Sequence, residues 1–143
     1  MLNFLKRFFQ PNLSGYESST GTIVDLEGHI QRVMRSSPEA FVIVEVNPEG
    51  DFVQFQGDSK GIRLDFPQST ARQRALKGSV LASLCSLHLE LIENKGSDGT
   101  VFLDCDINGD SGYISSTLTK FLAYVFQVSE ASPLKFTGYA LAP

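Results

Sequence analysis

Three apolar strand patterns follow one another with only short turns between them, and this run constrains the fold more than any other feature of the chain. Residues 41–46 are rich in β-branched side chains and lead into 47–50, Asn-Pro-Glu-Gly, a typical turn sequence. Residues 52–56 follow at once, and 62–66 alternate apolar residues with charged ones. Strands joined by such short turns pair antiparallel. The run therefore predicts an antiparallel sheet rather than the parallel crossover units of nucleotide-binding folds.

Helical patterns lie on either side of these strands. Thr22 can cap a helix with apolar residues at spacings of three and four, and this pattern stops before Pro38. Its apolar positions are Ile23, Leu26, Ile30, Val33 and Met34. A second helix is predicted from Ser69 or Thr70 to about residue 87, although Gly78 inside it costs about 1 kcal/mol relative to alanine. A third covers about 113–128.

Two further strands are predicted between the last two helices, over 89–93 and 101–107, joined by a loop of turn formers. The resulting order is α-β-β-β-α-β-β-α. Helices that interrupt a meander of strands favour an α+β fold, with an antiparallel sheet and the helices packed on one of its faces. The apolar tail over 134–141 either packs back on the domain or adds an edge strand.

The chain is expected to form one domain, because its 143 residues and its hydrophobic fraction of 42% are ordinary for a single globular unit. Turn formers over 10–21 predict a linker, so the expected division is an N-terminal segment and linker over 1–21 and a single α+β domain over 22–143. Residues 1–9 are apolar with two cations, and are too short for a signal peptide core or a membrane span. They predict a short helix packed on the domain or on a dimer mate, with a membrane-surface segment as the alternative.

Charge and cysteine content limit the classes of binding partner and the cellular compartments that we expect. The formal net charge is −4 and no Lys/Arg-rich run is present, so nucleic acid is not an expected partner. Cys85 and Cys105 lie in apolar patterns and are expected to be buried free thiols, since a zinc site or a disulfide framework needs more ligands. Free thiols favour a reducing compartment, so we expect a cytoplasmic location and no membrane insertion.

Residues 104–110 form the sharpest local motif. The run begins like an EF-hand calcium loop, with carboxylates at positions one and three, Asn at five and Gly at six. The match then fails, because Ser115 stands where the loop needs a bidentate Glu and the incoming residues are strand-like. The interpretation we favour is a turn in which Asp110 or Ser111 caps the last helix. Weak cation binding by the first two carboxylates is the alternative.

The sequence contains no recognisable catalytic apparatus, so no enzymatic activity, cofactor or metal is expected. Cys85 and His88 lie three residues apart on a predicted helix, but no third group orients them. A core thiol beside a helix-end histidine is the simpler interpretation. Four acids on predicted strands can meet across a sheet, yet acids on a solvated strand face are routine. They are Glu45, Asp65, Asp104 and Asp106.

The predicted strands carry apolar residues on both faces. One face must pack on the helices, and the other would expose some of a set of apolar residues. The set is Phe41, Ile43, Phe52 and Phe102. Such residues on the second face of an open sheet suggest a buried protein interface, and packing against the N-terminal segment is the alternative.

Two stretches resemble the type III secretion chaperone-like group, which includes the YbjN-type and TY-chaperone relatives. Residues 52–58, Phe-Val-Gln-Phe-Gln-Gly-Asp, look like the aromatic-x-Gln-aromatic signature of that family's second strand. Residues 124–128, Tyr-Val-Phe-Gln-Val, lead to Pro133 and Leu134, where the family commonly has a proline–leucine step. The resemblance covers 22–136 in element order. The chain departs from it at 86–88, Ser-Leu-His, in place of a Leu-Gly-aromatic step.

The resemblance implies a non-catalytic, homodimeric domain that holds extended segments of a client protein or peptide. Such binding uses hydrogen bonds at a sheet edge or apolar grooves for alternate client side chains. The partner-binding residues that it implies are Phe41, Ile43, Phe52, Gln54 and Phe102. Two other classes stay open: an immunity or inhibitor protein that binds one folded partner, and a weak metal-binding sensor.

Overall fold

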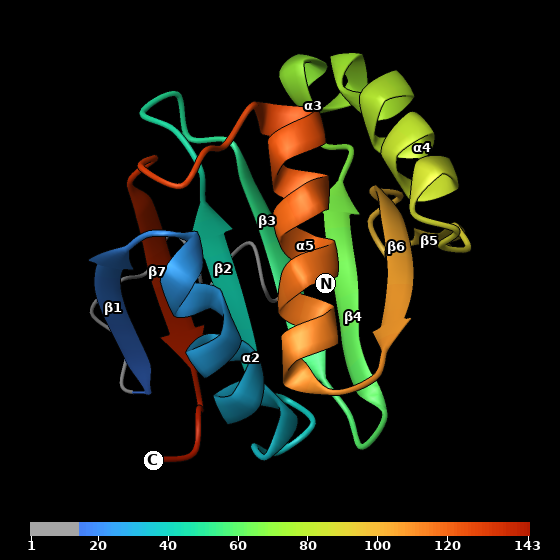
Figure 1. The fold of residues 1–143 in the computed structure, drawn as a ribbon. Helices are drawn as coiled ribbons and strands as arrows, with labels where there is room; N and C mark the ends of the chain where they lie inside the picture. Colours follow the sequence, from blue (N-terminus) through green and yellow to red (C-terminus); the bar gives the residue numbers. More distant parts are fainter. Residues whose placement is uncertain (1–14) are drawn as a thin grey trace.

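A seven-stranded antiparallel sheet forms the body of the molecule in a computed structural model, which describes residues 15–143 (Figure 1). The strand order across the sheet is β1-β7-β2-β3-β4-β6-β5. The strands are β1 (Tyr16–Gly21), β2 (Phe41–Glu45), β3 (Phe52–Gly57), β4 (Gly61–Pro67), β5 (Ile92–Lys95), β6 (Val101–Asn108) and β7 (Leu134–Tyr139). The helices are the 3-10 turn η1 (Ile23–Asp25), α2 (Leu26–Met34), α3 (Ala71–Ala75), α4 (Lys77–Ser86) and α5 (Ser111–Phe126). The α+β class and the antiparallel sheet are therefore confirmed.

Helices α2 and α5 lie side by side on one face of the sheet (Figure 1), which we call the first face. The side chains beneath them form one buried cluster, in which Ile30 of α2 and Phe121 of α5 meet Val44 of β2. Thr22 and Asp25 form a capping box at the start of η1, as the sequence predicts for Thr22. The spacing of three and four thus predicts the correct buried side of α2, where Leu26, Ile30 and Val33 are buried.

Two segments at the ends of the chain differ from the sequence-based expectation. Residues 16–21 form strand β1 rather than part of a linker, and they pair with β7 at one edge of the sheet. Residues 134–139 form β7, which lies between β1 and β2 and is not an edge strand. The tyrosine and small polar residues of β1 read as turn formers, because an exposed edge strand needs little apolar character.

The segment predicted as one helix over 69–87 is two helices that meet at Leu76. After α4 the backbone of His88 takes a left-handed φ of 57°, and the Leu89 amide donates to the Leu84 carbonyl at 2.9 Å. This helix-ending motif uses residues that the sequence assigns to a strand. For that reason β5 begins only at Ile92 instead of at residue 89.

The two thiols occupy different environments. Cys105 is buried in the core cluster, where burial and the nearby acids raise its pKa to about 12. Cys85 is exposed on α4, so the prediction of a buried thiol is wrong for this residue. The short amphipathic face of α4 turns Val80 and Leu84 to the core and leaves Cys85 on the other side.

Expectations for residues 1–9 lie outside the described residues. Within 15–143, no helix is both long and apolar enough to cross a bilayer.

Candidate functional site

The side chains on the sheet face opposite α2 and α5 form what we call the second face. Cross-strand register places Ile43 of β2 beside Gln54 of β3, Gln54 beside Asp65 of β4, and Asp65 beside Asp104 of β6. These four residues make one row across the middle of the sheet. Along each strand, the residue of this row alternates with residues of the core cluster. The side chains of the row therefore point away from the helices.

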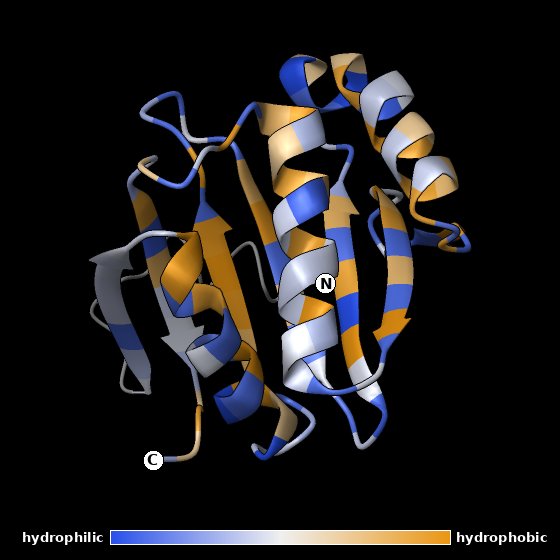
Figure 2. Ribbon diagram, in the orientation of Figure 1, coloured by the Kyte–Doolittle hydropathy of each residue, from blue (hydrophilic) through white to orange (hydrophobic). Residues whose placement is uncertain are grey.

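Aromatic side chains lie at one end of this row. Phe41, Ile43 and Phe52 form a second buried cluster, and Tyr16 and Tyr139 pack against it. The Phe41 and Tyr139 rings stack with centroids 5.3 Å apart. Figure 2 shows the same asymmetry along the strands: β2 is apolar from Phe41 to Val44 and ends at Glu45, whereas β4 and β6 alternate between apolar and polar residues.

All five residues that the resemblance implies as partner-binding lie on this second face. Alternation with the core residue Leu103 places Phe102 there as well. All five are buried, and the most exposed of them is Phe52 at 8%. The expectation that this face would leave some of them open to solvent is therefore wrong. Their binding role stays a prediction.

The centre of the second face holds a buried pair of carboxyl groups. Asp65 and Asp104 are only 1% and 2% exposed, so the expectation of a solvated strand face is wrong for both. Burial raises the pKa of Asp65, and the adjacent carboxyl group of Asp104 raises it further. The Asn94 side-chain amide of β5 also donates to Asp104. Gln54 lies beside this pair, and neither polar atom of its side chain has a hydrogen-bond partner within residues 15–143.

The remaining acids of the 104–110 run have separate tasks. Arg63 donates to both oxygens of Asp106 at 2.8 and 3.0 Å, on a part-exposed patch next to the buried pair. Asp110 caps α5, because its carboxylate accepts from the Tyr113 amide at 2.8 Å. The turn interpretation of this run is thus confirmed. No group of three or more His, Cys, Asp or Glu side chains that could hold a metal occurs in the described part of the chain.

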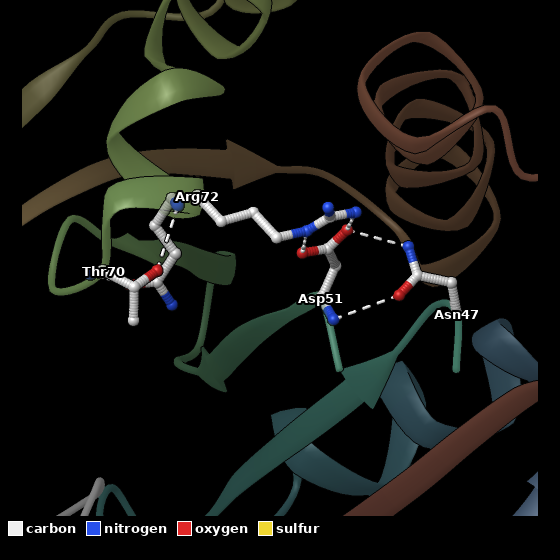
Figure 3. Close-up of polar contacts among 5 residues, drawn as sticks. Asn47, Asp51, Thr70 and Arg72 are labelled. Atoms are coloured by element: carbon white, nitrogen blue, oxygen red, sulfur yellow. Dashed lines mark hydrogen bonds and ion pairs between the residues drawn. The ribbon is translucent and has the colours of Figure 1, made fainter. Parts of the chain in front are cut away.

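A polar network closes the end of the sheet next to Phe52. Figure 3 shows Arg72 of α3 reaching the carboxylate of Asp51, with both contacts at 2.6 Å. On the other side of Asp51 the Asn47 side chain donates to the carboxylate at 2.8 Å and accepts from the Asp51 amide at 3.2 Å. The Thr70 cap starts α3 and so fixes Arg72 in its first turn. No local sequence pattern predicts this network, because Asp51 and Arg72 belong to separate elements.

Two cavities open at this end of the sheet. One of about 430 Å³ lies between Phe52 and the Asp51–Arg72 pair. Another of about 550 Å³ lies beside the C-terminal end of α5, where Phe126 and Val128 form part of its wall. Glu45 contributes to both cavities, and the smaller one also contains Glu49. Both cavities therefore combine apolar walls with acidic groups.

Replacing Asp51 by asparagine is expected to lower the free energy of unfolding by about 1–2 kcal/mol at neutral pH, because Arg72 loses a charged acceptor. The hydrogen bond from Arg72 lowers the pKa of Asp51, so this stability is present above pH 4 and is lost as the pH falls through the lower folded-state pKa. Urea unfolding at several pH values measures both effects. The matched change Glu49→Gln, in the same turn but exposed, is expected to shift stability by less than about 0.5 kcal/mol. Equal losses for the two variants would contradict the role given to Asp51.

The histidines take no part in these sites. His29 of α2 stacks on Phe136 of β7 with ring centroids 4.1 Å apart. Burial and the nearby Arg32 lower its pKa. His88 lies at the left-handed end of α4. In the described part of the chain, His29 thus packs against the sheet and His88 ends a helix.

Comparison of the chain with protein-family models, with curated proteins and with solved structures finds no match in any of the three. The resemblance to the secretion chaperone-like group therefore stays a prediction based on the residues quoted for it.

Proposed function

We propose that this protein is a non-catalytic binding domain that holds a polypeptide segment against the second face of its sheet. The observation that carries the proposal is the composition of that face: an aromatic cluster beside a buried carboxyl pair, on the side of the sheet opposite α2 and α5. The class agrees with the one that the chaperone-like resemblance implies, in which the client is a protein or peptide, the assembly is a homodimer and the location is cytoplasmic.

Apolar contact supplies the first half of the recognition. Phe41, Ile43 and Phe52 form a compact, buried apolar patch whose most exposed member is Phe52, and Phe102 lies further along the same face. Aromatic side chains bury a large area and favour ring-to-ring contacts, so a client segment with aromatic residues fits this patch. The cavity beside Phe52 extends the patch to the edge of the face.

Charge supplies the second half. Asp65 and Asp104 are two adjacent buried carboxyl groups, and a negative charge on such a pair is costly unless a group of opposite sign lies beside it. Glu45 and Glu49 add acidic groups at the cavity near Phe52. A client segment with a lysine or arginine among its aromatic residues therefore matches the face better than an acidic one.

Fluorescence polarisation of labelled synthetic peptides tests the proposal with the 143-residue chain. Peptides that combine aromatic and basic residues are expected to bind, whereas peptides with the same aromatic residues and acidic ones are not. Asp104→Asn removes the charge of the pair with little change of shape and is expected to weaken binding about tenfold, which corresponds to 1.4 kcal/mol. Glu130→Gln removes an exposed charge on the loop after α5 and is expected to leave the affinity unchanged.

Two results would count against the proposal. One is the absence of binding across the whole peptide set, and the other is the same affinity in Asp104→Asn and in the unchanged chain. Light scattering tests the homodimer separately, since a monomeric mass at every concentration contradicts it.

A further inference from the structure

We propose that the cavity of about 550 Å³ at the C-terminal end of α5 binds a free α-amino acid with a large apolar side chain. Glu45 then pairs with the ammonium group of the ligand and Lys135 with its carboxylate, while the apolar side chain fills the cavity. The inference goes beyond the proposed function, because this cavity is separate from the aromatic cluster of the second face.

Most of the cavity wall is apolar and comes from two short segments. One segment follows β2, and the other connects α5 to β7. Small-molecule pockets are typically lined by apolar side chains, with a few polar groups that fix the orientation of the ligand. The wall of this cavity therefore suits the apolar part of a small molecule. Its apolar residues are Val46, Pro48, Phe126, Val128, Pro133 and Leu134.

Hydrogen bonds within each segment hold the two walls in place. In the first segment the Gly50 amide donates to the Asn47 carbonyl at 3.2 Å, and the Asn47 side chain donates to Asp51 at 2.8 Å. In the second the Ser129 amide donates to the Ser132 hydroxyl at 2.8 Å, and the Ser132 amide donates to the Ser129 carbonyl at 3.1 Å. The shape of the cavity thus depends on contacts of the chain itself, so binding a ligand orders few further residues.

Two opposite charges lie next to each other in this wall. The register of the sheet pairs Glu45 of β2 with Lys135 of β7, and both residues line the cavity. The Lys135 Nζ lies 3.7 Å from the Glu45 Oε2, which is beyond hydrogen-bond distance. The same oxygen is buried and has no hydrogen-bond partner within residues 15–143. A buried acceptor without a donor costs free energy, and an ammonium group in the cavity supplies the donor.

A zwitterion matches this pair of charges better than a ligand with a single charge. An amine alone gains Glu45 but lies close to the ammonium of Lys135, and a carboxylate alone gains Lys135 but lies close to Glu45. An α-amino acid carries both groups on neighbouring atoms, so the four charges alternate in sign. The Lys135 side chain is 56% exposed, and its flexible stem can turn the ammonium towards the ligand carboxylate.

Isothermal titration calorimetry of the 143-residue chain with L-phenylalanine tests the inference. Saturable binding is expected, with a dissociation constant at or below about 1 mM. Phenethylamine lacks the carboxylate and 3-phenylpropionate lacks the ammonium group. Each is expected to bind at least about tenfold more weakly than phenylalanine, because each leaves one charge of the wall facing a like charge.

Two variants each remove the partner of one charged group of the ligand. Lys135→Met is expected to weaken phenylalanine binding about tenfold and not to weaken phenethylamine, which has no carboxylate to lose. Glu45→Gln is expected to weaken phenylalanine by a similar factor and not to weaken 3-phenylpropionate. Lys120→Met and Glu49→Gln make the same chemical changes at exposed positions outside the cavity, and are expected to leave all three affinities unchanged.

Three results would overturn the inference: no saturation by phenylalanine, leucine or tryptophan, equal affinity for phenylalanine and its two analogues with one charge, or loss of all three ligands in a folded variant. Circular dichroism checks the folding of each variant, and the three ligands on the unchanged chain still decide the preference for a zwitterion if a variant does not fold. Peptide binding by a chain that does not bind amino acids would leave the proposed function standing without this inference.

Discussion

Replacing Asp65 by asparagine is expected to make the protein more stable at neutral and alkaline pH and to flatten its dependence of stability on pH. Asp65 is 1% exposed and lies between Gln54 and Asp104 in the middle row of the second face. The asparagine side chain has nearly the same shape, and its amide can donate a hydrogen bond to the Asp104 carboxyl group. The variant therefore keeps the packing of this side chain, but it has no carboxyl group that can gain or lose a proton.

The direction of this pH dependence follows from the pKa of Asp65 in the folded and the unfolded chain. Burial and the hydrogen bond to Asp104 raise its pKa to about 10 in the folded chain, whereas an unfolded chain releases this proton near pH 4. Between these values the folded state binds one more proton, so stability falls as the pH rises, by up to about 1.4 kcal/mol per pH unit. The stability that depends on a protonated Asp65 is fully present below pH 4. By pH 7 the loss is on the order of several kcal/mol, and the variant avoids it.

Urea unfolding between about pH 5 and pH 9 measures this effect. The difference in free energy of unfolding between Asp65→Asn and the unchanged chain is expected to widen as the pH rises. Asp106→Asn is the matched control on the neighbouring strand, where Arg63 lowers the pKa of a part-exposed carboxylate. Its effect is expected to stay within about 1 kcal/mol and to vanish in acid instead. Parallel profiles for Asp65→Asn and the unchanged chain would falsify the raised pKa of Asp65.

Regular patterns made much of the fold predictable from the sequence. The alternation of residues 62–66 and the β-branched run of 41–46 predict strands, because a half-buried sheet imposes a period of two. The spacing of Ile30 and Val33 likewise predicts the buried side of α2, and the carboxylate of Asp110 predicts the cap of α5. These are local requirements, so a local sequence reveals them.

The partners of a strand are set by the whole fold and are not visible locally. Residues 134–139 read as an apolar tail, and nothing within them indicates that β7 lies between β1 and β2. The sequence already marks Asp65 and Asp104 among four acids that can meet across the sheet, but their burial is not visible locally. Each occupies an alternating polar position, and only the register of β4 with β6 shows which two acids lie side by side and are buried.

Replacing Gly57 by alanine is expected to destabilise the fold by roughly 2–3 kcal/mol, because α2 crosses the end of β3 at this residue. A Cβ built on Gly57 would lie 2.5 Å from the carbonyl oxygen of Val33 and 2.8 Å from the Cα of Met34. Both are backbone atoms of the last turn of α2, so no rotation of a side chain can relieve the contact. The helix has to move away from the sheet, and the packing of Val33 on the core is lost with it.

A second glycine provides the control for this prediction. Gly78 lies inside α4, and a Cβ built on it has no atom within 4 Å. Gly78→Ala is therefore expected to stabilise the protein by up to about 1 kcal/mol, because alanine favours the helix. Urea unfolding of both variants compares the same chemical change at two places. A loss at Gly78 as large as that at Gly57 would mean that the added methyl acts through something other than the close approach of α2 to β3. Opposite signs would tie the effect to that approach, which keeps α2 packed on the first face of the sheet.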